Sequence, residues 1–498
     1  MTSIVRVKEH DACFAKLEID QGVAYELREF FSFYSNGYQF HPKFKAKMWD
    51  GKIRLFDPRT KFLYVGLLDA LREFCDDFEY KLVDETAYSE KVDVSEDIAQ
   101  EIADKIGLNP KYVLRDYQKK YIYEAIRDSR SVNLSPTSSG KSLIIHIIRS
   151  YYKTEFNART LIVVPTVGLV KQMAGDLIDY GTNPDEIHEI SAGKSKNTDK
   201  SIVISTWQSL ARIEDKEWFK QFDVVLGDEA HTFAAKSLQD IMTSMTNAFW
   251  RHGFTGTIGS DSKVNKMVLE GLFGKVRKFV STDDLIKSGT VADFRVEAII
   301  LKHDKEIAKI FSKELKKLDG GAKKYFAERE FLSNNHARNI FITKLVMTRK
   351  GENSLILFDL VEKHGKVLQK YLQKIPDVKI HFVHGGTPAD ERERVRQEVE
   401  NDENKNHVIL ASFGVFSTGI SIKRLDYCMF AAGSKSEIRV LQSIGRVLRK
   451  GNGSDDAVLF DISDDITGNN YTLNHFKKRM EIYAKENFDV RVHNFNLK

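Results

Sequence analysis

The chain has 498 residues, of which 42% are hydrophobic, 30% are charged and only eight are proline. These values exclude a disordered chain, and the length predicts roughly two to four domains. With 76 basic and 71 acidic residues the net charge is only +5, which by itself does not indicate a nucleic-acid partner. The three cysteines are far apart and predict no metal site, and no apolar run approaches the roughly 18 residues of a membrane helix. We therefore expect a cytoplasmic protein without a membrane segment.

Residues 1–85 are dense in aromatic side chains and predict a small α+β domain. Within them the stretch 30–54 interleaves aromatic residues with lysine and arginine, which could stack on bases and neutralise phosphates. Lys43, Lys45, Lys47 and Trp49 are the candidate nucleic-acid contacts. A small core with a solvated basic rim would give the same composition, so both interpretations stay open. The acidic and polar residues 86–111 predict a linker with one helix.

From residue 112 onward, strand-like apolar runs alternate with amphipathic helical segments, which predicts parallel sheets covered by helices. We expect one α/β domain over 112–300, a helical connection over 301–350 and a second α/β domain over 351–498. The lysines of the connection could contact a nucleic-acid backbone, although a solvated helix face is the more common reason for such a pattern. The expected strands are Val132–Leu134, Leu161–Val164, Ile202–Ile204, Val224–Leu226, Gly253–Thr255, Leu355–Phe358, Ile380–Val383, Val408–Leu410, Tyr427–Phe430 and Ala457–Phe460.

A phosphate-binding loop is predicted after the first of these strands. Small, turn-prone residues separate the strand from an apolar helix that opens with Lys141 and Ser142. Backbone N–H groups and the helix dipole attract phosphate there, Lys141 adds a positive charge, and Ser142 offers a hydroxyl to Mg²⁺. The pattern departs from the strict P-loop at Ser135, where glycine is usual. The residues expected to cradle the nucleotide are Pro136, Thr137, Ser138, Ser139, Gly140, Lys141 and Ser142.

An acidic pair follows the apolar strand at 224–226, in the sequence Asp228-Glu229-Ala230-His231. Ligands of open α/β sheets bind beyond the carboxyl ends of strands. Asp228 is the candidate for holding Mg²⁺ together with Ser142, and Glu229 is the candidate for orienting and deprotonating the attacking water. Nearer the C-terminus, Arg446 and Arg449 lie three residues apart on a predicted helix, and their guanidinium groups suit a transition state with charge on phosphoryl oxygens.

Taken in order, these motifs resemble those of superfamily 2 helicases of the DEAH/DExH type, over about residues 112–463. The resemblance implies two RecA-like domains with ATP in the cleft between them, and it implies adenine recognition by Gln118 within Arg115-Asp116-Tyr117-Gln118. It implies phosphate contacts at Thr166, Thr206 and Thr418, and places Gly419 in a nucleotide-binding motif. Gly256 stands where alanine is usual, and Ser421 where an acidic residue is usual, which puts a ribose contact there in doubt.

An aromatic-rich N-terminal domain followed by such a motor is similar to bacteriophage recombination and repair helicases. This implies a monomeric, ATP-driven 3′ to 5′ motor on branched DNA, such as forks, Holliday junctions and R-loops, acting in the host cytoplasm. A partner could also be an RNA–DNA hybrid. A double-stranded DNA translocase and an RNA helicase remain alternatives. A clamp or annealing protein switched by ATP is a third, against which the complete set of Glu229, Arg446 and Arg449 argues.

Overall fold

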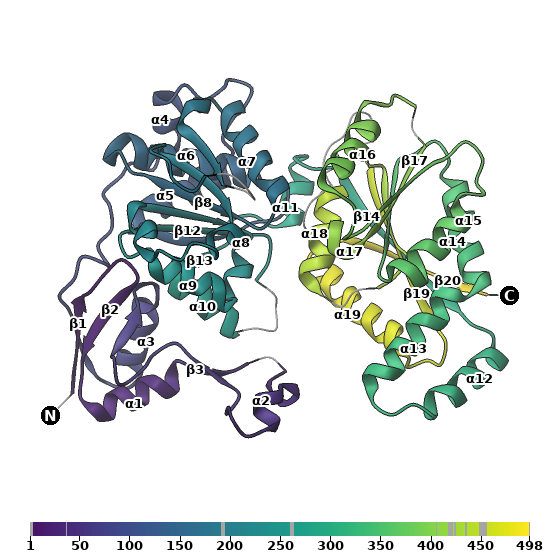
Figure 1. The fold of residues 1–498 in the computed structure, drawn as a ribbon, viewed down its shortest axis with the longest axis horizontal. Coiled ribbons are helices and arrows are strands. Elements are labelled where there is room, and N and C mark those ends of the chain that lie inside the picture. The colour runs from purple at the N-terminus through teal and green to yellow at the C-terminus, as the bar shows by residue number, and fades with distance from the viewer. Residues whose placement is uncertain are drawn as a thin grey trace. The chain divides into compact units, whose positions relative to one another are not determined.

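The computed structural model describes residues 3–35, 37–190, 195–258, 263–404, 406–416, 422, 425–433, 436–447 and 456–497. These residues form two compact units: the first runs to Phe279, and the second runs from Val280 onward and includes residues 136–139. Within the described ranges, each unit has a seven-stranded sheet whose strand pairs are all parallel. Figure 1 shows helices on both faces of each sheet. The predicted α/β fold class with two RecA-like sheets is confirmed.

The N-terminal residues form a mixed four-stranded sheet in the order β5-β2-β1-β6, together with a separate hairpin of β3 and β4. Alternating apolar residues of β1 and β2, such as Val5, Val7 and Leu17, are buried against α1 and α3. The hairpin spans the basic, aromatic stretch of the sequence. The elements are β1 Ile4–Glu9, β2 Phe14–Glu18, α1 Gln21–Phe30, β3 Ser32–Tyr34, η1 Tyr38–Phe40, α2 Pro42–Lys45, β4 Lys52–Arg54, β5 Phe62–Tyr64, η2 Val65–Leu67, α3 Leu68–Asp77 and β6 Lys81–Asp84.

The first parallel sheet has the strand order β13-β7-β12-β11-β8-β10-β9. Its strands are apolar on both faces: Leu161 and Val163 join the core that continues into the N-terminal domain, whereas Ile162 and Val164 join the core under α5, α6 and α7. Helix α4, in the predicted linker, packs on this second core through Ile102. The elements are α4 Ile98–Lys105, α5 Asp116–Asp128, β7 Arg130–Leu134, α6 Lys141–Phe156, β8 Thr160–Val164, α7 Val167–Asp179, η3 Pro184–Glu186, β9 Ile187–Ile190, β10 Ile202–Thr206, α8 Trp207–Leu210, η4 Lys216–Gln221, β11 Val224–Asp228, η5 Ala230–Ala234, α9 Lys236–Ser244, β12 Trp250–Thr255, α10 Lys263–Phe273 and β13 Val276–Arg277.

Polar contacts fasten the N-terminal domain to this first sheet. The guanidinium of Arg130 donates to the carbonyl oxygen of Ala12 at 2.5 Å, and that of Arg251 lies 2.8 Å from the Cys13 sulfur. At Gly66 a Cβ atom would come within 2.0 Å of the Glu270 carbonyl oxygen, so only glycine allows this close approach to α10. These buried contacts join a continuous apolar core, and the N-terminal domain and the first sheet belong to one compact unit.

The second parallel sheet has the order β16-β17-β15-β18-β19-β14-β20. Strand β14 precedes the helical connection yet pairs with β19 and β20, so the second unit begins before residue 301, earlier in the sequence than expected. The C-terminal residues form α19 and the edge strand β20. The elements are α11 Thr282–Lys287, β14 Asp293–Lys302, α12 Lys305–Lys316, α13 Gly321–Asn334, α14 His336–Thr348, β15 Ser354–Phe358, η6 Val361–Gly365, α15 Lys366–Leu372, β16 Lys379–Val383, α16 Ala389–Asn401, β17 His407–Ser412, α17 Phe413–Phe416, β18 Tyr427–Phe430, α18 Glu437–Val447, β19 Asp456–Asp465, α19 Tyr471–Lys485 and β20 Asp489–Asn496.

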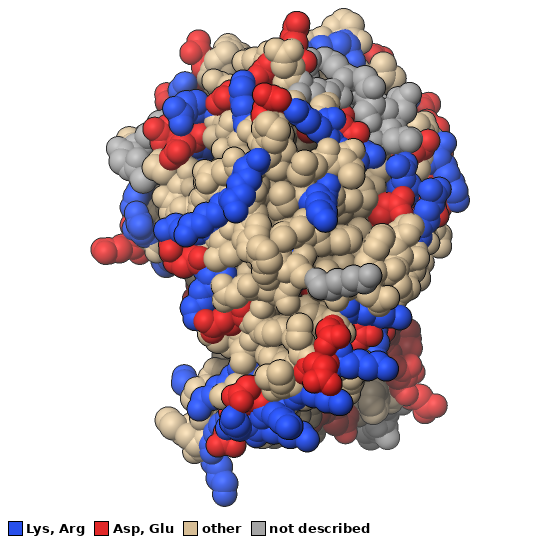
Figure 2. Space-filling model, turned by 90° about the vertical axis from the view of Figure 1, so that its right-hand side faces the viewer, with Lys and Arg blue, Asp and Glu red and all other residues tan. Residues whose placement is uncertain are grey.

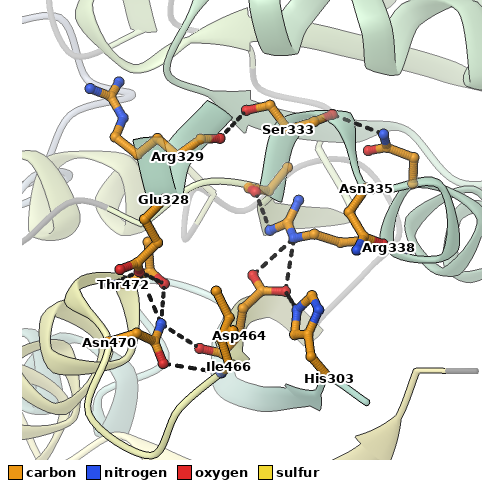
Figure 3. A network of polar contacts seen from close by, with 12 residues as sticks. His303, Glu328, Arg329, Ser333, Asn335, Arg338, Asp464, Ile466, Asn470 and Thr472 are labelled. Carbon is orange, nitrogen blue, oxygen red and sulfur yellow. Dashed lines mark hydrogen bonds and ion pairs between the residues drawn. The ribbon is translucent and has the colours of Figure 1, made fainter. Parts of the chain in front are cut away.

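A buried polar network ties the helical connection to the second sheet (Figure 3). The Arg338 guanidinium on α14 donates to the Asp464 carboxylate at 2.8 Å, and His303 contacts the same carboxylate at 3.0 Å. On α13, the Glu328 carboxylate accepts from the Asn470 amide at 2.9 Å. Each of these side chains is nearly inaccessible to solvent. Moving α13 or α14 away from the sheet would therefore leave buried charged groups without their partners. The helices α13 and α14 are therefore an integral part of the second unit.

Charged side chains of both signs are mixed over most of the face of the second unit that Figure 2 shows. On α12, exposed lysines lie beside acidic residues, and Lys317 pairs with Glu314 at 2.6 Å. This pattern fits the solvated helix face better than a dedicated nucleic-acid patch. Among the described helices, none is long and apolar enough to cross a membrane.

Candidate ATP site and nucleic-acid contacts

The predicted phosphate-binding loop lies between β7 and α6. Gly140 is the N-cap of α6 and has a φ of 80°, a left-handed conformation that glycine adopts without strain. The helix that follows runs for 16 residues from Lys141 to Phe156, so its first N–H groups and its dipole are available to a phosphate. The strand, the loop and the helix start are therefore confirmed as elements, and the nucleotide contacts of residues 136–142 stay predictions.

Gln118 lies directly against this loop. Its Oε1 accepts from the backbone N–H of Arg115 at 2.9 Å, which caps α5, and the side chain is 2% exposed. A Cβ atom at position 140 would lie 2.4 Å from Gln118 Nε2, so the amide packs on the Cα of Gly140. The structure thus places Gln118, the residue predicted to recognise adenine, against the phosphate-binding loop, and Arg115 is joined to Gln118 through its backbone N–H.

The two carboxylates are at the end of β11, a central strand of the same sheet. Asp228 is the last residue of the strand, and Glu229 follows it in a left-handed conformation with a φ of 49°. Burial raises the pKa of Asp228 to about 6, and the negative charge of Glu229 adds to this effect, while Lys141 opposes it. Asp228, Glu229 and Lys141 therefore share one electrostatic environment.

The residues Ser142 and Asp228 have the chemistry that Mg²⁺ needs, a hydroxyl and a carboxylate oxygen. The negative charge of Glu229 helps to raise the pKa of Asp228, and a bound divalent cation would relieve this repulsion. The Ser142 hydroxyl lies 2.8 Å from the Tyr180 hydroxyl. The sequence did not identify Tyr180, because the two residues are 38 positions apart in the chain. The Lys141 ammonium donates to the Ser135 carbonyl oxygen at 3.1 Å.

His231 connects the acidic strand end to the next strand. Its Nδ1 lies 3.0 Å from the Thr255 hydroxyl oxygen on β12, and Thr255 in turn donates to the Thr257 carbonyl oxygen at 2.9 Å. The same ring nitrogen lies 3.3 Å from the Glu229 carboxylate. His231 thereby joins the acidic residues to the Thr255–Thr257 turn, which agrees with a coupling role rather than a chemical one.

Two of the threonines predicted to contact nucleic acid lie at the carboxyl ends of neighbouring strands in the first sheet. Thr166 is the N-cap of α7 and Thr206 is the N-cap of α8, each accepting a backbone N–H through its hydroxyl. Their strands β8 and β10 are neighbours, with Thr206 opposite Val164. However, Thr206 is only 3% exposed, so the N–H groups of its helix are better placed for a phosphate than its hydroxyl is.

The basic aromatic hairpin extends from the N-terminal sheet, with α2 near its tip (Figure 1). Lys43, Lys45 and Lys47 are exposed. The indole N–H of Trp49 donates to the Lys52 carbonyl oxygen at 2.9 Å, so this ring braces the hairpin. The aromatic and apolar side chains that are exposed instead, which the predicted contact set did not include, are Tyr34 at 55%, Phe40 at 77% and Met48 at 77%.

The arginine-bearing segment of the second unit begins in α18, whose Ile444 is buried. The predicted helix is thus confirmed as far as Val447, and Arg446 belongs to it. Arg449, Thr418 and Gly419 lie outside the described residues.

Tandem RecA-like sheets with a Gly-Lys-Ser loop, an Asp-Glu-Ala-His strand end and an arginine-bearing helix define an ATP-dependent helicase of superfamily 2. Three family models match the chain: the N-terminal domain of the DNA helicase UvsW over residues 4–84, the res subunit of type III restriction enzymes over 111–260, and the helicase conserved C-terminal domain over 337–451. The ATP-dependent DNA helicase uvsW of Enterobacteria phage T4 is 34% identical over 516 residues, which span 99% of this chain and all of the relative. The chain belongs to the UvsW family of ATP-dependent DNA helicases, as the predicted resemblance implies.

Solved structures and a more distant relative agree with this assignment. A crystal structure of T4 UvsW matches 99% of this chain and all of its own with a TM-score of 0.52 and 32% identity. The DNA 3′-5′ translocase XPB2 of Sulfurisphaera tokodaii is 24% identical over 407 residues, covering 75% of this chain and 87% of that protein. The enzyme therefore uses ATP and acts on DNA.

Proposed function

We propose that this helicase uses ATP hydrolysis to unwind or branch-migrate branched DNA, including forks, Holliday junctions and R-loops, during recombination, repair and replication. The observation that carries this proposal is the packing of the N-terminal domain, which bears a basic, aromatic hairpin, against the first motor sheet. Contacts from Ala12, Cys13 and Gly66 hold the N-terminal domain in place. Movement of the motor along one strand would then carry the hairpin to the branch point.

At the ATP site, the backbone N–H groups of residues 136–140 and the Lys141 ammonium would hold the phosphates, and Arg115 and Gln118 would select adenine. Ser142 and Asp228 would hold Mg²⁺, which neutralises phosphate charge when bound. Glu229 would accept the proton of the attacking water. Arg446 and Arg449 would stabilise the charge on the transferring phosphoryl group, and Gly419 would contact the nucleotide.

Translocation would use contacts that do not depend on the base sequence. The helix starts at Thr166 and Thr206 would bind phosphates of one strand, with Thr418 serving the second motor domain. Lys43, Lys45 and Lys47 would neutralise further phosphates, while Trp49 supports the hairpin. We further propose 3′ to 5′ polarity, which the similarity to the DNA 3′-5′ translocase XPB2 supports, and action in the host cytoplasm, which the similarity to a phage protein supports. We also propose that the helicase acts as a monomer.

The test replaces Lys43, Lys45 and Lys47 by alanine in the full chain and measures unwinding of a fork and binding to plain duplex DNA. The matched control replaces Lys309, Lys313 and Lys316 of α12, which removes the same charge elsewhere. We expect the hairpin variant to lose fork unwinding at least tenfold while the control stays near the parent. If both variants lose fork unwinding equally, the loss reflects the change in net charge and not the hairpin, which would contradict the proposal.

A second candidate function is double-stranded DNA translocation without strand separation, which the similarity to XPB2 favours. It predicts that ATP hydrolysis responds equally to a fork and to a plain duplex, and that displacement of a bound third strand occurs without unwinding. An RNA–DNA hybrid remains a possible substrate of the first proposal, since an R-loop contains one.

A further inference from the structure

Two imidazoles and a carboxylate converge at one edge of the second sheet, far along the chain from the ATP motifs. His381 lies on the edge strand β16, Glu398 on helix α16, and His407 on the neighbouring strand β17. One ligand atom from each side chain lies within 4.8 Å of the other two. The Nε2 of His381 is 2.8 Å from the Nδ1 of His407, and the two rings are nearly parallel.

The tautomer of His407 is set by Asp402. The His407 Nε2 lies 3.1 Å from the Asp402 carboxylate, and this carboxylate also accepts from the Lys379 ammonium at 2.6 Å. The N–H of His407 therefore points at Asp402, and the lone pair of Nδ1 points toward His381. A carboxylate that orients a histidine in this way is a regular feature of metal-ligating histidines.

The burial of the three side chains leaves the group accessible from one side. His381 is partly buried. Glu398 is exposed, whereas His407 is fully buried, so the group is open to solvent on the side of the carboxylate. A water molecule could complete four ligands from that side.

We propose that His381, Glu398 and His407 bind a divalent transition metal ion, and that Zn²⁺ suits these ligands best. Two imidazole nitrogens around tetrahedral zinc are about 3.3 Å apart, so the present 2.8 Å must widen by about 0.5 Å. The ion would take the place of the His381 Nε2 proton, and that ring would carry its N–H on Nδ1 instead, so both imidazoles would bind as neutral ligands. It would join β16, α16 and β17, and so stabilise the exposed edge of the second motor sheet.

The experiment titrates metal-free full-length protein with Zn²⁺ by calorimetry and with Co²⁺ by visible absorption. The background is Asp228→Asn, which removes the proposed Mg²⁺ carboxylate, so binding at the ATP site does not mask the result. We expect one Zn²⁺ per chain, a four-coordinate Co²⁺ spectrum and a higher midpoint of thermal unfolding with Zn²⁺. Failure to bind Zn²⁺ in this background would overturn the proposal.

Three variants in the same background locate the ion. His381→Gln and Glu398→Gln each remove one ligand and are expected to weaken Zn²⁺ binding at least about tenfold and to abolish the Zn²⁺-dependent thermal shift. Glu398 is exposed, so its variant tests the site even if His381→Gln lowers stability. The control His336→Gln removes an exposed histidine of α14 and should bind like the parent. Equal binding by all three variants would place the ion elsewhere and contradict the proposal.

Discussion

The hydroxyl of Ser142 lies 2.8 Å from the hydroxyl of Tyr180, so the group expected to ligate Mg²⁺ is engaged by a side chain from the end of α7. Tyr180 is held in turn by an edge-to-face contact with Tyr112, at 4.7 Å between ring centroids. Mg²⁺ ligation by Ser142 would have to compete with this hydrogen bond.

Tyr180→Phe removes the competing hydroxyl and keeps the ring. A hydrogen bond of this kind contributes about 0.5 to 1.5 kcal/mol, so the Mg²⁺ concentration for half-maximal ATP hydrolysis should fall about two- to tenfold. Ser142→Ala should instead abolish the Mg²⁺ response. An unchanged Mg²⁺ requirement in Tyr180→Phe would show that the two hydroxyls do not compete with the ion.

Gly140→Ala tests the packing of Gln118 on the phosphate-binding loop. The new Cβ would lie 2.4 Å from Gln118 Nε2, and a φ of 80° costs alanine roughly 1 kcal/mol. We expect ATP binding to weaken at least tenfold, as measured by titration with a fluorescent ATP analogue. Gly175→Ala on α7 is the control, since no heavy atom lies within 4 Å of its Cβ position. A Gly140→Ala variant that binds ATP as the control does would remove Gln118 and the loop glycine from the site.

The raised pKa of Asp228 predicts that replacing this carboxylate increases the stability of the protein but abolishes its activity. A carboxyl whose pKa is raised to about 6 binds a proton that the unfolded chain has already lost. The stabilisation is complete below about pH 4 and is lost as the pH rises through about 6. Asp228→Asn should therefore stabilise the nucleotide-free protein by about 1 to 3 kcal/mol at pH 7.5 and by less at pH 5, while abolishing hydrolysis. Thermal unfolding at both pH values without Mg²⁺ measures this, and a destabilised variant at pH 7.5 would refute the assignment.

The sequence motif that contains Arg446 and Arg449 predicts that both arginines are needed for ATP hydrolysis. Arg446→Ala and Arg449→Ala should each lower the rate of ATP hydrolysis strongly, within the roughly 10³- to 10⁵-fold range of arginine fingers, while ATP still binds. Single-turnover hydrolysis and nucleotide titration separate the two effects. Losses below tenfold in both variants would exclude them from the transition state.

The sequence predicted those strands that are continuously apolar. All ten expected strands are present, and most of them are buried on both faces of a parallel sheet, which requires apolar runs. The exception is β16, an edge strand whose residues are mostly only partly buried. The edge strands β9 and β20 lack such a run, and β20 is mostly exposed on both faces. Strand β14 is apolar but precedes the helical connection, and only its pairing with β19 assigns it to the second sheet.

The candidate site was predictable where the chemistry lies in short motifs. Lys141, Asp228 and Glu229 were found because a loop and a strand end each carry their residues together. Tyr180, Arg251 and the His381–His407 pair were missed, since these contacts join residues far apart in the sequence or on neighbouring strands. Trp49 illustrates the opposite case: its place in a basic aromatic stretch predicted base stacking, but its indole N–H is bonded within the hairpin.

The most direct test of the branched-DNA proposal measures ATP hydrolysis without nucleic acid and then with single-stranded DNA, duplex DNA, a DNA fork and structured RNA. We predict that the fork stimulates hydrolysis more strongly than duplex DNA of the same length and that RNA has little effect. Equal stimulation by fork and duplex, or stimulation by RNA alone, would contradict a motor for branched DNA.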